Sequence, residues 1–204
     1  MSNHVTSSTS PHADYYPELL RLARATLAHY LATGGQPPYV PNNDWFTTPA
    51  AVFVTLRVRE ARKAASPYSE GWAAGDLRGC VGHIYDDKPL YEVVQEETIQ
   101  AASVDPRFYP VTADELDNLI IEISVLSPFR PVESLDEIAI GQDGLYLVGG
   151  SERALLLPEV PLGYGWGKEA FLRALIDKAG LPPDVWPGRA ALYAFTTESF
   201  EESP

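Results

Sequence analysis

Apolar and polar residues recur along residues 15–84 in patterns that predict one helix followed by two strands. Residues 15–32 place apolar side chains at helical spacing, with Asp14 as the expected N-cap and glycines 34–35 ending the run. In residues 52–58 every second position is valine or leucine, a pattern typical of a half-buried strand. A second strand is predicted over residues 77–84, after a loop rich in serine, glycine and proline.

Two further helices follow from the same periodicity. The first should start at residues 87–89, with Asp87 as its cap and a proline in its first turn, and should end at residues 105–106, where an aspartate precedes a proline. The second is led by Trp166 and ended by Gly180.

The remaining segments read as short strands and turns. They are a capping-box turn at residues 112–115, a strand at 119–126, a hairpin of 144–148 with 154–157, and a last strand at 190–195. Irregular insertion of about three helices among hairpin-connected strands predicts an α+β fold with a largely antiparallel sheet. We expect a disordered tail over residues 1–13 and a single domain over residues 14–204, with room for a small appended lobe around residues 36–49 and 60–76.

Composition narrows the class of protein. The 204 residues contain no apolar run long enough to span a membrane, and the polar first thirteen residues do not resemble a secretory signal. A single cysteine excludes an intrachain disulfide and fits a reducing cytoplasm. The net charge of −13 disfavours nucleic-acid binding, which draws on lysine and arginine. Nothing in the sequence decides between a monomer and a homodimer.

The lone cysteine defines the candidate site. Cys80 lies between Gly79 and Gly82 and two residues after Arg78, and strand alternation would put Arg78 and Cys80 on one face. A guanidinium nearby favours the thiolate, which is the reactive form of cysteine. The alternative is that Cys80 is a small apolar residue that fills space in a strand.

Two charged residues admit both structural and functional interpretations. Arg78 either binds an anionic ligand or pairs with a buried carboxylate, and Glu122, inside an apolar strand, is the partner we expect. Glu122 could instead serve as a general base. In residues 105–108 we expect Asp105 to make a turn and Phe108 to anchor in the core, while Arg107 could reach the face of Cys80.

No cofactor is expected. The four histidines show no metal-ligand spacing, and neither a dinucleotide-binding nor a phosphate-binding glycine motif is present. We expect His83 to be an ordinary strand residue.

Six motifs in order give the chain a resemblance to the AMMECR-type domain family, named from the Alport syndrome, mental retardation, midface hypoplasia and elliptocytosis region. They lie at residues 77–82, 105–108, 122–127, 140–145, 156–160 and 178–181. Glu159 replaces the glutamine of many members, and Ile176 replaces a second cysteine, which weakens any mechanism that needs a cysteine pair. The resemblance implies a cytosolic α+β protein of unassigned activity with a cleft at residues 77–82. It also implies an association, in microbes, with Memo-type and radical S-adenosylmethionine proteins.

Two hypotheses follow. In the first, the protein is an enzyme or enzyme component that acts on a small anionic or carbonyl-containing substrate. Arg78 would then orient the anion, Cys80 would supply the thiolate and Glu122 would orient the substrate or act as a base. Gly79 and Gly82 would give a ligand access to the backbone, with Arg107 as a further binding residue. In the second, the protein is a non-catalytic module that docks partner proteins, such as the two classes named above.

Overall fold

The computed structural model describes residues 10–61 and 71–203 and contains two compact units. The first unit comprises the chain up to Val125 together with residues 199–204, and the second comprises residues 126–198. The family-typical motifs are divided between them. The prediction of a single domain over residues 14–204 stays a prediction, and the part of the predicted lobe at residues 62–70 lies outside the described residues.

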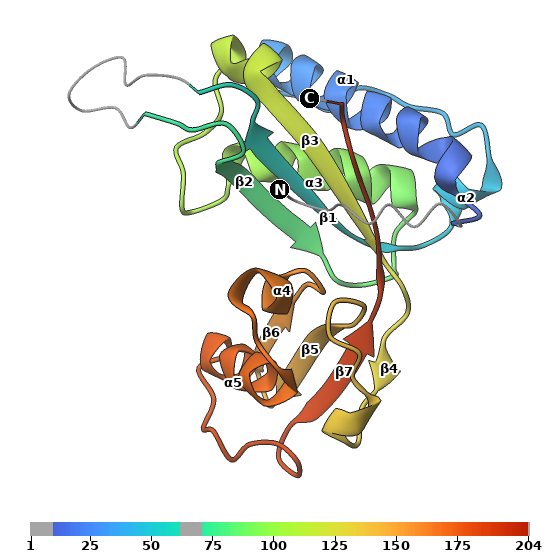
Figure 1. The fold of residues 1–204 in the computed structure, drawn as a ribbon. Helices are drawn as coiled ribbons and strands as arrows, with labels where there is room; N and C mark the ends of the chain where they lie inside the picture. The colour runs from blue at the N-terminus through green and yellow to red at the C-terminus, as the bar shows by residue number, and fades with distance from the viewer. Residues whose placement is uncertain (1–9, 62–70, 204) are drawn as a thin grey trace. The chain divides into compact units, whose positions relative to one another are not determined.

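The first unit is a four-stranded sheet in the order β2-β1-β3-β8, with helices on one face (Figure 1). Its elements are η1 (Ala13–Tyr15), α1 (Tyr16–Thr33), α2 (Asp44–Thr47), β1 (Ala51–Val58), β2 (Leu77–His83), α3 (Leu90–Ser103), η2 (Ala113–Asn118), β3 (Leu119–Leu126) and β8 (Thr197–Glu201). The expected first helix begins two residues after Asp14, which lies in the preceding 3-10 turn and is not the N-cap. Its expected end is confirmed, because Gly34 takes a φ of 76° at the C-cap, where a residue with a Cβ would be strained.

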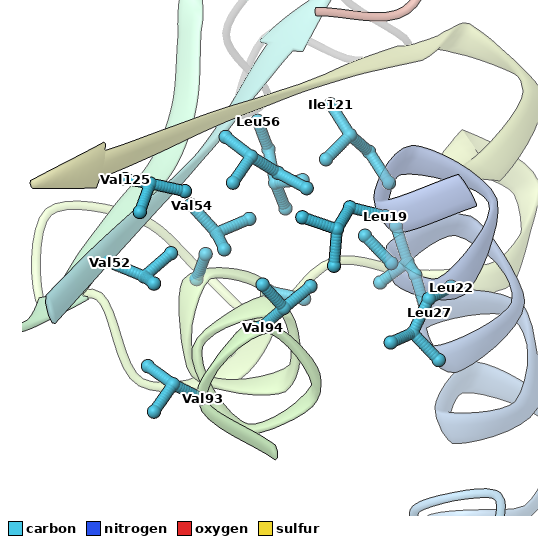
Figure 2. Packing of buried hydrophobic residues seen from close by; sticks show 14 of the residues in the cluster. Leu19, Leu22, Leu27, Val52, Val54, Leu56, Val93, Val94, Ile121 and Val125 are labelled. Atoms are coloured by element: carbon cyan, nitrogen blue, oxygen red, sulfur yellow. The ribbon is translucent and has the colours of Figure 1, made fainter. Parts of the chain in front are cut away.

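Alternation along β1 separates a core face from an outer face. Val52, Val54 and Leu56 are fully buried and meet Leu19 and Leu27 from α1 and Val93 and Val94 from α3 (Figure 2). The intervening residues of β1, among them Thr55 and Arg57, therefore lie on the outer face. The same alternation in β3 puts Ile121 and Ile123 in the core and Glu122 on the outer face.

The second unit is a four-stranded sheet in the order β4-β7-β5-β6. Its elements are β4 (Arg130–Pro131), η3 (Leu135–Glu137), β5 (Gly144–Gly149), β6 (Glu152–Leu156), α4 (Val160–Tyr164), α5 (Lys168–Lys178) and β7 (Ala191–Phe195). The apolar face of α5, with Phe171 and Leu175 fully buried, packs with Leu145 and Leu147 of β5 in a second core.

The predicted α+β class and antiparallel strand pairing are confirmed, and the three long helices match the three expected. The strands divide between two sheets, whereas the sequence pattern suggested one. Of the predicted tail, residues 1–9 lie outside the described residues, while the ring of His12 stacks on Trp45 with 4.4 Å between the ring centres. None of the helices among the described residues is long and apolar enough to cross a membrane.

Candidate functional site

Cys80 lies on β2, which forms one edge of the first sheet (Figure 1). It stands opposite Thr55 of β1, and the hydroxyl of Thr55 donates a hydrogen bond to the Cys80 Sγ over 3.2 Å. The side chain of Cys80 is thus on the outer face of the sheet and partly buried.

Glu122 shares this outer face but is held by a different arginine from the one expected. The Nε of Arg57 donates to Glu122 Oε2 at 3.2 Å. Because Arg57 is two residues from Thr55 on β1, the Arg57–Glu122 pair and the Thr55–Cys80 pair lie on one face of three neighbouring strands. The structure therefore brings Cys80 and Glu122 to the same face.

The free edge of β2 is covered by residues 105–110, which we call the edge segment. Asp105 accepts a hydrogen bond from the backbone N–H of Cys80 at 2.9 Å, and Arg107 Nη2 donates to the Cys80 carbonyl over 3.3 Å. The Nε and Nη2 of Arg107 also donate to the two carboxylate oxygens of Asp105. Together the two side chains satisfy the outward-pointing backbone groups of Cys80, as a neighbouring strand would.

Arg107 fixes the ionisation of Asp105. The side chain of Arg107 is 54% exposed and that of Asp105 is 3% exposed, and the hydrogen bonds from Arg107 lower the pKa of Asp105 to about 2. The expected turn at Asp105 is present, because its Oδ1 accepts from the Arg107 N–H. Phe108 is only partly buried and contacts Trp72, with 5.9 Å between the ring centres, so its predicted place in the core is wrong.

Arg78 is buried and engaged on all sides by protein groups. It is the extra residue of a bulge, since Leu56 pairs with Gly79 and Arg57 pairs with Leu77. Its Nε and Nη2 donate to the carboxylate of Glu115 at 2.7 and 2.9 Å. The Nη1 and Nη2 donate to the carbonyls of Tyr109 and Pro110, and the guanidinium lies 5.6 Å from the centre of the Trp72 ring.

The pairing of Arg78 with Glu122 is therefore wrong, although the expectation of a buried carboxylate partner holds with Glu115 in its place. Burial raises the pKa of Glu115, but the hydrogen bonds from Arg78 and from the Thr112 N–H outweigh it, and the pKa is lowered. Because the bulge turns Arg78 toward the edge segment, strand alternation does not place it beside the thiol.

Both glycines beside Cys80 have neighbours that would collide with a Cβ. At Gly79 a Cβ would lie 2.1 Å from the backbone oxygen of Ala101 on α3. At Gly82 it would lie 2.3 Å from the ring of Phe53. Protein atoms therefore leave no room for a side chain at either position, which is a structural reason for glycine that needs no ligand.

The surroundings of Cys80 favour the neutral thiol. Burial raises the pKa of the Cys80 thiol above its ordinary value. The hydroxyl of Thr55 and the charge of Arg107 lower that pKa, while the carboxylates of Glu122 and Asp105 raise it, and the net shift is upward. The expected activation of the thiol by Arg78 is not present; the nearby guanidinium that favours the thiolate belongs to Arg107.

We expect the native Cys80 to alkylate several-fold more slowly than the unfolded chain between pH 7 and 9, because both burial and the raised pKa reduce the concentration of reactive thiolate. Iodoacetamide labelling followed by mass spectrometry in buffer and in urea measures this at one site, since the chain has one cysteine. A native rate that levels off below about pH 8 would contradict it.

His83 has a partner at the end of β2. Its Nε2 lies 2.6 Å from Asp87 Oδ1, so Asp87 bonds to this ring and is not the cap of α3, which starts at Leu90 after Pro89. Among residues 10–61 and 71–203 no group of three or more His, Cys, Asp or Glu side chains is placed to hold a metal ion.

The second unit carries an open hollow of about 230 Å³ beside α5. Leu172, Ile176 and Trp186 form its apolar wall, and Glu169 and Arg173 line it as well. None of the site residues expected from the sequence lines this hollow.

Three residues that lie close to Cys80 or Arg78 were not identified from the sequence. Thr55 and Arg57 were predicted only as polar positions of an alternating strand. Which of them lies opposite Cys80 depends on the strand register, which the sequence does not give. Glu115 was expected as a capping residue and does bond back to the Thr112 N–H at 3.0 Å, but the same carboxylate also binds Arg78.

Comparison with known proteins finds similarity over most of the chain. The AMMECR1 family model matches residues 20–200. Protein MJ0810 of Methanocaldococcus jannaschii is 38% identical over 190 residues, which cover 90% of this chain and 88% of that protein. A protein of Thermococcus gammatolerans is 42% identical over 193 residues, with the same coverage. The crystal structure of the uncharacterized protein PH0010 from Pyrococcus horikoshii has a TM-score of 0.80 at 37% identity, covering 93% of this chain and 92% of that one.

Proposed function

The chain belongs to the AMMECR1 family, and we propose that it is a binding module whose edge segment docks a partner protein. One observation carries the proposal: Tyr109 is 91% exposed although its backbone carbonyl is fixed by the buried Arg78. Tyrosine and arginine are enriched among the residues that dominate binding energy at interfaces. A side chain presented from an ordered backbone loses less conformational entropy when it binds.

Arg107 provides a second group on the edge segment that could bind a partner. Its Nε and Nη2 are occupied by Asp105 and by the Cys80 carbonyl, while its Nη1 makes no hydrogen bond among the described residues. That nitrogen can donate to a carboxylate or carbonyl without disturbing the pair with Asp105. We therefore propose a partner that presents an acidic or carbonyl group beside an apolar pocket able to take the phenol ring of Tyr109. The family resemblance suggests Memo-type and radical S-adenosylmethionine proteins as the first partners to test.

An enzymatic role is the second candidate. The observation that favours it is the charge of Arg107 beside Cys80, with Glu122 on the same face as the thiol. In that case Arg107, and not Arg78, would orient a small anionic or carbonyl-containing substrate. The raised pKa of the thiol argues against a resting thiolate nucleophile, so a low plateau in the alkylation profile described above would favour the enzyme over the binding module.

We expect Tyr109→Ala to weaken binding of the Memo-type protein from the same organism by about 30-fold, since a hot-spot residue contributes about 2 kcal/mol. Calorimetric titration of the two purified full-length proteins measures the affinity. Arg107→Lys, which keeps a positive charge for Asp105, should weaken binding by a smaller factor.

Tyr164→Ala is the matched control, because this tyrosine is 70% exposed on α4 of the second unit. Its affinity should equal that of the unchanged protein. Equal affinities for Tyr109→Ala and Tyr164→Ala would contradict docking at the edge segment, and so would a lack of binding to both suggested partner classes.

A further inference from the structure

Helix α3 buries a carboxyl group against the site strand without satisfying it. Glu97 is 3% exposed, and its Oε1 accepts one hydrogen bond, from Gln100 Nε2 at 3.1 Å. Its Oε2 is buried and has no hydrogen-bond donor among the described residues. An unsatisfied buried oxygen is costly, and the cost is far larger when the carboxyl group is ionised.

The charges around Glu97 are committed to other partners. Lys88 Nζ bonds to Glu96 Oε2 at 2.6 Å, and His83 Nε2 lies 2.6 Å from Asp87 Oδ1. His83 and Lys88 lower the pKa of Glu97 and Glu96 raises it, but burial is the largest influence, and the pKa rises from 4.5 to about 7. Ionisation of Glu97 therefore requires either water or a donor taken from one of these pairs.

Helix α3 and strand β2 are in close contact one helical turn from Glu97. Glu97 is one helical turn before Ala101, whose backbone oxygen touches Gly79 so closely that a Cβ there would lie 2.1 Å away. The contact between helix and strand thus leaves no room for even one methyl group at that point.

We propose that Glu97 is a proton-operated latch: protonated, it keeps α3 closed on β2, and ionised, it loosens this contact. Movement of α3 would be transmitted to Cys80 directly, because Asp105 follows the end of α3 by two residues and binds the Cys80 N–H. The latch thus makes the exposure of the Cys80 edge depend on pH. It stands independently of the docking proposed above.

The single thiol reports the state of the latch. A raised carboxyl pKa in the closed form means that the closed form is favoured most at or below pH 4.5 and less as the pH rises to about 7, with no further change above. The pKa of Glu97 differs between 4.5 in the open form and about 7 in the closed form. The equilibrium constant for opening should therefore increase by up to roughly 300-fold as the pH rises across this range. The rate of reaction of Cys80 with 4,4′-dithiodipyridine, which labels thiols in mild acid, follows that opening.

The experiment compares the full-length protein with Glu97→Gln, because the ratio of their labelling rates cancels the ionisation of the thiol itself. We expect the ratio of unchanged protein to variant to rise at least tenfold between pH 4.5 and 7 and to stay level up to pH 8.5. Glu97→Leu, which also cannot ionise, should label with the same pH dependence as Glu97→Gln.

Glu92→Gln is the matched control, because Glu92 is a partly exposed carboxylate on the same helix and accepts a hydrogen bond from the Tyr91 hydroxyl. This variant should keep the full rise of the unchanged protein. A ratio that does not change with pH would overturn the proposal. So would a rise that disappears in Glu92→Gln, because the proton would then be held elsewhere.

Discussion

Replacing Arg78 with alanine is expected to lower the free energy of unfolding of the first unit by about 3–5 kcal/mol. The Arg78 side chain is 6% exposed and its partner Glu115 is 18% exposed, so the loss leaves a carboxylate in a poorly solvated place. The carbonyls of Tyr109 and Pro110 lose their donor at the same time. Removing one member of a buried, hydrogen-bonded ion pair is among the most destabilising single changes.

Urea unfolding at pH 7, followed by circular dichroism, measures the effect. Since the chain has two compact units, the transition of the first unit should move while any separate transition of the second stays in place. Arg78→Lys should recover only part of the loss, because an ammonium group cannot reproduce the fork of donors. A loss below 1 kcal/mol for Arg78→Ala would show that Arg78 does not hold the edge segment.

Arg57→Ala is the contrasting control for this experiment. Arg57 also pairs with a carboxylate on the same sheet, but its side chain is 39% exposed and that of Glu122 is 19% exposed. Water screens such a pair, so the expected loss is about 1 kcal/mol or less. Similar losses for Arg57→Ala and Arg78→Ala would contradict the assignment of Arg78 as the structural member of the two.

The sequence predicted the elements better than the contacts between them. Helix α5 and strands β1 and β3 follow from periodicity, because each buries one apolar face or alternates along its length. The short strand β8 was missed: Thr197–Glu201 has no apolar alternation, and its place comes from pairing, with Glu202 N–H donating to the Ile121 carbonyl.

The sequence drew attention to Cys80 and its neighbours but did not predict the contacts that they make. Local sequence places Cys80 in a strand, yet a one-residue bulge decides that Arg78 leaves the face of the thiol. Likewise, the motif at residues 105–108 reads as a helix end from local rules alone. That Asp105 and Arg107 bind the Cys80 backbone depends on the fold bringing residues 25 and 27 positions apart together.

Gly79→Ala tests the most consequential of these reassignments, because it asks whether the glycine serves a ligand or the fold. We expect it to lower the free energy of unfolding of the first unit by about 3 kcal/mol or to prevent folding. The new Cβ would lie 2.1 Å from the Ala101 backbone oxygen, and a helix backbone cannot rotate away as a side chain can. The strand or the whole of α3 would have to shift.

Substitutions of two other glycines in the same unit serve as controls for the loss of stability. Gly35→Ala introduces only an ordinary contact of 3.6 Å with Thr33 Oγ1 and should change the stability by less than about 1 kcal/mol. Gly82→Ala meets the ring of Phe53, a partly exposed side chain that can turn aside, so its loss should lie between the other two. A stable, fully folded Gly79→Ala protein would mean that α3 does not pack on β2 as described. It would also contradict the proposal for Glu97, because that proposal requires close contact between α3 and β2.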